Sequence, residues 1–330
     1  MNLKSLLLSG AFALLSVAFV YGQSDETKKG NVTIGVRGGL TMPGFTGGSG
    51  NPLSEGYSSI TRLGAGVFAD FRISNLFSIQ PMLEYTQEGA KKNGFQAFSS
   101  DQFISGLSPQ IGQGLVQAGL PQELAPAVGQ AVNQAFANSP IFYANFNSRA
   151  HLDYLMLPVL AKFGWDLGQQ KRWRIYVDAG PYISLLLNAN QVVSNGENNT
   201  LGTIYTGNTT NSPSVGTILK GTFQELEQDP QFGQILAQNP QLAQQIGQLI
   251  QGIPNQPSSL NASQDIKSSI HPINWGLEGN LGIQYQIGGR NKIFVEGGGN
   301  YGLMNIQKYA ADGKNHNGAA TVMVGYGYTL

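Results

Sequence analysis

The chain has 330 residues, a formal net charge of zero at pH 7, 44 glycines and no cysteine. The lack of cysteine excludes a disulfide framework and the cysteine-borne lipid anchor of a lipoprotein. The balanced charge, without a basic stripe, excludes the electrostatic footprint of a nucleic-acid-binding protein. Glycine is abundant, but it follows no three-residue period, so a collagen-like fold is excluded as well.

The chain begins with the pattern of an export signal. Lys4 supplies a positive charge, an apolar run follows over residues 6–20, and the small Gly22 suits the position before a cleavage site. Residues 1–22 are therefore predicted to be a signal peptide. The alternative is a helical membrane anchor, but the run is shorter than the roughly 20 residues that a spanning helix needs. No later uncharged apolar run approaches that length, so any membrane crossing must use strands.

Large apolar residues alternate with small or polar residues in eight segments, which is typical of strands with two different faces. The last segment shows this best, because Val322, Val324 and Tyr326 alternate with Met323, Gly325 and similar residues. The eight predicted strands span residues 31–41, 62–73, 76–87, 152–166, 173–187, 273–287, 292–304 and 321–330. Each is long enough to cross a bilayer at a tilt. A fully antiparallel, all-β barrel is the fold that this pattern predicts.

The predicted connections alternate between short and long. Tight turns near residues 74–75, 167–172 and 288–291 separate long connections over residues 42–61, 88–151, 188–272 and 305–316. Outer-membrane barrels have short periplasmic turns and longer extracellular loops. The alternation of short and long connections predicts an eight-stranded transmembrane barrel over residues 31–330. Both termini would lie in the periplasm, and the insertions at 88–151 and 188–272 would be extracellular.

Two further patterns agree with a barrel in the outer membrane. Aromatic residues gather at the short-turn ends of the predicted strands, as in an interfacial girdle: Phe71, Phe77, Phe163, Trp165, Trp173, Tyr285 and Tyr328. Charged residues fall on the face opposite the apolar set: Arg37, Arg62, Asp70, Arg72, Glu84, Lys162, Arg174, Asp178, Glu278 and Glu296. Because Arg or Lys facing lipid costs about 2–4 kcal/mol near the midplane, we expect these groups to face the lumen and to pair across it. Pro158 and Pro181 lie inside strands, where we expect a bulge or locally broken pairing.

The two long insertions carry helix signals. In the first, Pro121 precedes apolar residues at four-residue spacing, namely Leu124, Val128, Val132 and Phe136. In the second, Thr222 and Glu225 have capping-box spacing, and Asp229-Pro230 and Asn239-Pro240 each pair an N-cap residue with proline. The last helix has an apolar stripe and ends at Gly252: Leu242, Ile246, Leu249 and Ile250. We predict short helices that pack on each other or on a partner; the alternative is that these glutamine-rich segments are largely disordered.

Several strand segments together resemble the PorT-like outer-membrane β-barrel family. They are residues 35–40 (GVRGGL), 63–71 (LGAGVFADF), 77–85 (FSIQPMLEY), 155–162 (LMLPVLAK), 176–182 (YVDAGPY) and the ending 325–328 (GYGY). The resemblance covers the strands and not the insertions. It implies an eight-stranded barrel, and some relatives take part in a specialised protein-secretion system. One departure is Leu330, where such barrels usually end in an aromatic residue.

No residue is predicted to be catalytic, to bind a cofactor or to hold a metal. Gly276, Gly279 and Gly282 recur without the Lys and Ser or Thr of a phosphate-binding loop. The histidines, His151, His271 and His316, fall where the chain re-enters the barrel.

An open channel is disfavoured, because side chains fill the interior of an eight-stranded barrel. The sequence therefore favours a non-enzymatic, monomeric protein of the cell outer membrane that contacts the lipid bilayer. Its insertions 88–151 and 188–272 would bind a protein or glycan partner. The alternatives are an accessory of an outer-membrane secretion or assembly system and an outer-rim hydrolase or metal site at the three histidines, with Asp153 nearby.

Overall fold

The computed structural model describes residues 31–47, 50–195, 199–258 and 262–330, so the predicted signal peptide lies outside the described residues. The chain divides into two compact units. The barrel unit comprises residues 31–91, 149–191 and 264–330, and the helical unit comprises residues 92–148 and 192–263. Among the described residues, no helix is both long and apolar enough to cross a bilayer.

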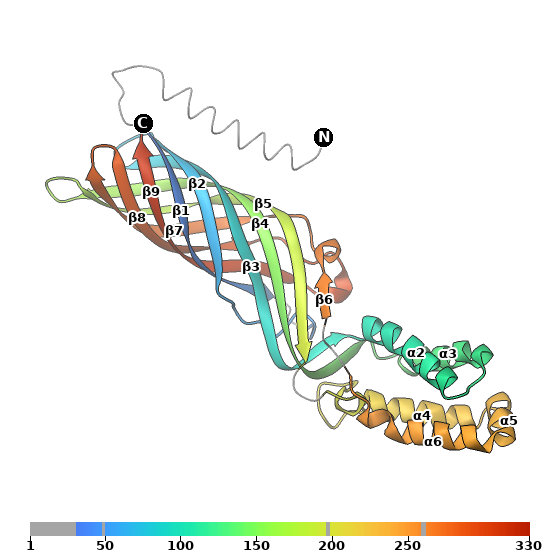
Figure 1. Ribbon diagram of the computed structural model, residues 1–330. Coiled ribbons are helices and arrows are strands. Elements are labelled where there is room, and N and C mark those ends of the chain that lie inside the picture. The colour runs from blue at the N-terminus through green and yellow to red at the C-terminus, as the bar shows by residue number, and fades with distance from the viewer. Residues whose placement is uncertain (1–30, 48–49, 196–198, 259–261) are drawn as a thin grey trace, which may run out of the picture. The chain divides into compact units, whose positions relative to one another are not determined.

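Eight long strands form a closed antiparallel ring, which confirms the predicted barrel (Figure 1). They are β1 (Val32–Gly47), β2 (Arg62–Arg72), β3 (Phe77–Ser99), β4 (Ile141–Leu167), β5 (Trp173–Asn195), β7 (Ile273–Gly288), β8 (Asn291–Gly302) and β9 (Asn315–Thr329). The order is β4-β3-β2-β1-β9-β8-β7-β5, and the pairing of β4 with β5 closes the ring. The first and last strands pair from Thr33↔Thr329 to Gly47↔Asn315.

Three strands continue beyond their predicted ends. β3 runs to Ser99, β4 begins at Ile141, and β5 reaches Asn195, so these strands enter both units. A short additional strand that we did not predict, β6 (Ala262–Asp265), pairs with β5. Burial alternates along β4, but before residue 150 the apolar residues, such as Phe142 and Phe146, lie on the buried face. A pattern that requires apolar residues on the outer face therefore underestimates the length of the strand.

The expected bulge at Pro181 is absent from the pairing of β5 with β7. That register runs unbroken from Trp173↔Tyr285, through Pro181↔Leu277, to Leu185↔Ile273. In an antiparallel pair the residues alternate between hydrogen-bonded and non-hydrogen-bonded positions, so a proline at a non-bonded position interrupts nothing on that side. β4 also continues as one strand through Pro158.

The outer face of the barrel is apolar and exposed, as predicted. Side chains such as Leu63, Val324 and Leu281 are 58–64% exposed, and large apolar side chains on every strand of the ring share this face. Soluble monomers rarely expose a contiguous apolar surface of this extent. Lipid must therefore cover this face of the barrel.

Glycine in the barrel wall makes room for aromatic rings in the lumen. A Cβ at Gly325 would overlap the ring of Phe294, and a Cβ at Gly282 would overlap the ring of Tyr176. Phe68 lies over Gly35 in the same way. An eight-stranded lumen is only wide enough for side chains, so each inward ring needs a small residue beside it. This packing accounts for much of the glycine content of the strands.

The helical unit has its own hydrophobic core, assembled from both insertions. Its helices are α2 (Ser100–Gln117), α3 (Ala125–Ala135), α4 (Val215–Glu227), α5 (Pro230–Gln238) and α6 (Pro240–Gly252), with short 3-10 turns at Gln122–Leu124, Leu201–Thr203 and Ile253–Asn255. Two more 3-10 turns, Lys267–Ser269 and Ala310–Asp312, belong to the barrel unit. Val128, Val132 and Phe136 are buried in this core as their spacing predicted, whereas Leu249 is exposed. We did not predict α2.

The helix starts are partly as predicted. Asp229 caps α5, since its carboxylate accepts hydrogen bonds from the backbone N–H groups of Gln231 (2.9 Å) and Phe232 (3.2 Å). The capping box at Thr222 is wrong, because α4 begins earlier and is capped by Ser214. Inside α4, the Thr222 hydroxyl donates to the backbone carbonyl of Ile218 instead.

Replacing Gly325 with alanine tests the lumen packing. The new methyl group would overlap the Phe294 ring, so we expect the free energy of unfolding to fall by about 1–3 kcal/mol, the usual range for overpacking. Urea unfolding of the protein in lipid vesicles measures this change. Gly297→Ala is the matched control, because its Cβ would have 3.9 Å to the nearest atom and should change little. Equal stability of the two variants would contradict this packing.

Replacing Asp229 with alanine tests the cap of α5. Loss of a capping carboxylate costs about 1 kcal/mol, and hydrogen exchange of the α5 amides should speed up accordingly. Gln234→Ala is the control, since Gln234 is an exposed residue of the same helix. Similar exchange rates in the two variants would count against the cap.

Candidate functional site

The centre of the lumen holds an arginine cluster, composed of Arg37, Glu84, Glu278 and Glu296 from four different strands. Nη1 of Arg37 lies 2.6 Å from a carboxylate oxygen of Glu296, and Nη2 lies 2.7 Å from Glu278 and also contacts Glu84. All four side chains are at most 5% exposed. The hydroxyl of Tyr176 donates to the second oxygen of Glu296 at 2.8 Å. The predicted pairing of lumen charges is thus confirmed at the barrel centre.

Next to the arginine cluster, toward the short turns, lies a mixed layer of rings and one amine. Lys162 lies 3.7 Å from the centre of the Tyr176 ring and donates a 3.0 Å hydrogen bond to Gln80. The rings of Phe68 and Phe294 meet edge to face, 5.6 Å apart, in an apolar group with Met82 and Leu160. These side chains come from five strands of the ring, namely β2, β3, β4, β5 and β8.

Toward the long loops, the lumen contains a polar layer around Glu88. Asn317 donates to the buried carboxylate of Glu88 and accepts a hydrogen bond from Asn274. Beyond it lies an apolar group that includes Leu152, Leu186, Ile270 and Ile306. The predicted insertion begins at Glu88, whereas β3 continues through this residue. Glu88 is an even number of residues from Glu84, so both side chains lie on the inward face of one strand.

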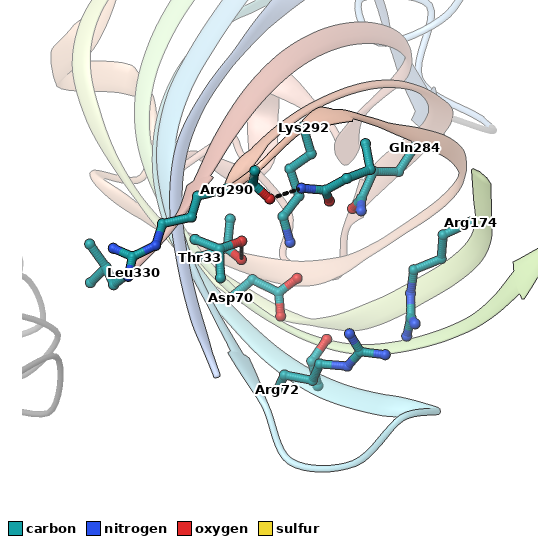
Figure 2. Close-up of a pocket in the computed structure, with 12 residues that line it drawn as sticks. Thr33, Asp70, Arg72, Arg174, Gln284, Arg290, Lys292 and Leu330 are labelled. Carbon is teal, nitrogen blue, oxygen red and sulfur yellow. Dashed lines mark hydrogen bonds between the residues drawn. The ribbon is translucent and has the colours of Figure 1, made fainter. Parts of the chain in front are cut away.

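At the opposite end, the short-turn mouth contains a pocket of about 310 Å³ (Figure 2). Its walls include Asp70, Arg72, Arg174 and Lys292. Arg174 lies 2.9 Å from the carboxylate of Asp166, and Arg72 lies 3.6 Å from the same carboxylate. Lys292 was not among the predicted lumen charges, although it is in phase with Glu296 on β8.

The three histidines have separate surroundings in the barrel unit. Nε2 of His151 lies 3.0 Å from the Arg62 guanidinium, whereas Nδ1 of His316 lies 3.1 Å from the carbonyl of Gly302. His271 donates its backbone N–H to the carbonyl of Ile306. Within the described ranges, no three His, Asp or Glu side chains are grouped as metal ligands. The ion pairs among the described residues lie inside the lumen and at the short-turn mouth.

Comparison with known families decides the assignment of this barrel. The family model of the outer membrane protein β-barrel domain matches residues 21–308. The chain belongs to this family. It is a protein of the cell outer membrane and is embedded in a lipid bilayer. The family model does not distinguish a PorT-like group. Comparison with curated proteins gives no match.

Three solved outer-membrane proteins are similar to this chain. Neisserial surface protein A is 9% identical, with 92% of this chain and 99% of that chain covered and a TM-score of 0.33. Ail, the attachment invasion locus protein of Yersinia pestis, is 8% identical, with 91% and 100% covered and a TM-score of 0.29. OprG from Pseudomonas aeruginosa is 10% identical, with 93% and 99% covered and a TM-score of 0.30.

Replacing Arg37 with methionine tests the arginine cluster. The change leaves three buried carboxylates without their guanidinium, and removing one partner of a buried ion pair costs about 3–5 kcal/mol. We expect a fall of that size in the free energy of unfolding in lipid vesicles. Arg72→Met is the matched control, because its side chain is 40% exposed and its pair with Asp166 should contribute at most about 1 kcal/mol. A smaller effect for Arg37→Met than for Arg72→Met would contradict the cluster's role.

Proposed function

We propose that this outer-membrane β-barrel is a non-enzymatic surface-binding protein that presents its helical unit to a protein or glycan partner outside the cell. The observation that carries the proposal is the shared core of the helical unit. Phe142 and Val128 from the first insertion are buried in one cluster with Leu219, Phe223 and Ile246 from the second. Two insertions that fold together form a defined surface, which a binding role requires.

The composition of the helical surface supports a partner recognised by hydrogen bonds. The exposed face of α6 carries Gln241, Gln244, Gln245 and Gln248, and exposed glutamines also occur on α2, α3 and α5. Each amide side chain both donates and accepts hydrogen bonds without a charge. Glycan hydroxyls and peptide groups match this chemistry better than polyanions do.

The lumen supports a role outside the barrel interior. The arginine cluster, the aromatic layer beside it and the polar layer around Glu88 occupy successive levels of the lumen. A water-filled channel would need these side chains to move apart. We therefore place the function of this family member on its loops and treat it as a monomeric barrel.

A role as an accessory of a secretion system is the second candidate. It rests on the PorT-like segments, such as residues 155–162 and 176–182. An outer-rim hydrolase has less support, since the ring of His151 contacts Arg62, while Asp153 accepts a hydrogen bond from Asn188.

Replacing both insertions tests the proposed function. Because the two insertions share one core, deletion of only one would expose the buried face of the other, so residues 92–148 and 192–263 are each replaced by a short Gly-Ser turn. Cells that display equal amounts of the native and shortened barrels are applied to arrays of glycans and extracellular proteins. We expect binding by the native chain and at least about tenfold weaker binding by the shortened barrel.

Two controls separate binding from assembly. Heat-dependent migration in detergent gels reports whether the shortened barrel is folded in the membrane. Changing Gln241, Gln244, Gln245 and Gln248 to glutamate keeps the helix but adds charge, and it should also weaken binding. Full binding by a correctly assembled shortened barrel would overturn the proposal. A secretion defect in those same cells would favour the accessory role.

A further inference from the structure

The pocket at the short-turn mouth is built by most of the barrel wall. Seven of the eight strands of the ring, or the turns that join them, contribute residues to it. Its volume of about 310 Å³ lies in the range of pockets that bind small molecules. Short turns of outer-membrane barrels face the periplasm, so ligands would reach the pocket from that side.

The charges of this pocket are not balanced. Four cationic side chains line it, namely those of Arg72, Arg174, Arg290 and Lys292, against one acidic side chain, that of Asp70. Two carboxylates lie nearby, and the Oδ1 atom of Asp70 makes no hydrogen bond to the described residues. Asp166 forms ion pairs with Arg72 and Arg174, and Asp70 lies 4.0 Å from Lys162.

Lys292, like Arg290, forms no ion pair within 4.0 Å among the described residues. Its amine makes no hydrogen bond and no ion pair within 4.0 Å to any group in the described part of the chain, and Figure 2 shows it extending into the pocket above Asp70. The Arg72 and Arg174 side chains extend into the same space. Arg290 lies on the side of the mouth nearest Leu330 in this view.

Neutral donors line the same space. The side chain of Ser78 is 3% exposed, yet its hydroxyl makes no hydrogen bond to the residues that the structure describes. The half-buried amide of Gln284 also makes no hydrogen bond to the described residues. Both groups therefore remain free to donate to a molecule that enters the pocket.

We propose that this pocket binds an oxyanion, a phosphate or carboxylate group carried by a periplasmic molecule or by a lipid headgroup. Guanidinium groups match the planar edges of carboxylate and phosphate, and an ammonium adds a point charge. The anion would lie between Lys292 and the pair Arg72 and Arg174, with Ser78 and Gln284 donating to its remaining oxygens. On the lumen side, the next level of the barrel contains Lys162 and the edge-to-face rings of Phe68 and Phe294.

Titration with inorganic phosphate and with acetate tests this inference. The full chain is placed in nanodiscs of zwitterionic phosphatidylcholine at low ionic strength, where charge interactions are least screened, and binding is measured by calorimetry. Loss of a charged hydrogen-bond partner weakens binding by about tenfold or more, which is the effect expected for Lys292→Gln. Ser78→Ala should weaken binding by a smaller factor. Lys314→Gln removes the same charge from an exposed position outside the pocket and should leave the affinity unchanged.

The lipid composition of the nanodiscs distinguishes a soluble periplasmic anion from a lipid headgroup as the ligand. If nanodiscs that contain phosphatidylglycerol give the same phosphate affinity, the ligand is a soluble periplasmic anion. If phosphatidylglycerol competes with free phosphate, the ligand is a lipid headgroup. The absence of phosphate and acetate binding by the native chain in phosphatidylcholine would overturn the proposal, as would equal affinity in Lys292→Gln and the native protein. Correct folding of each variant is verified by heat-dependent gel migration.

Discussion

The narrow lumen of an eight-stranded barrel limits every other feature of this fold. Its interior is only wide enough for the side chains of its own wall. Every inward position is therefore either a large side chain that fills the space or a small residue that admits one, as Gly282 admits Tyr176. The narrow width also brings charged groups together, because Arg37 contacts carboxylates from three other strands.

Filling the lumen separates the chemistry of the barrel into two levels. At the centre, three carboxylates surround one guanidinium, and the group is sealed from water. At the short-turn mouth, cations exceed carboxylates and the space is open. The central cluster joins four strands through the buried contacts of Arg37 with Glu84, Glu278 and Glu296. Arg290 and Lys292 at the mouth form no ion pair among the described residues. The mouth is therefore the part of the barrel unit suited to a ligand.

The helical unit follows a different rule from the barrel. Barrel strands expose apolar side chains to lipid and bury polar ones, whereas the helices bury Val132, Leu219 and Ile246 and expose amides to water. The solvent around each unit explains the reversal. Water favours burial of apolar surface, and lipid removes that driving force from the barrel exterior, leaving hydrogen-bond closure of the backbone as the controlling requirement.

Alternation, loop order and the confinement of charge to one face are local properties that lipid outside and a lumen inside impose, so the barrel could be predicted from the amino-acid pattern. The start of α5 could be predicted too, since Asp229 and Pro230 form a favourable helix start. Which charges meet could not be predicted, since Arg37 and Glu296 are neighbours through barrel closure and not through spacing. The same holds for the shared core of the two insertions, for the inward position of Glu88 and for the pocket around Lys292, all of which depend on contacts between distant segments.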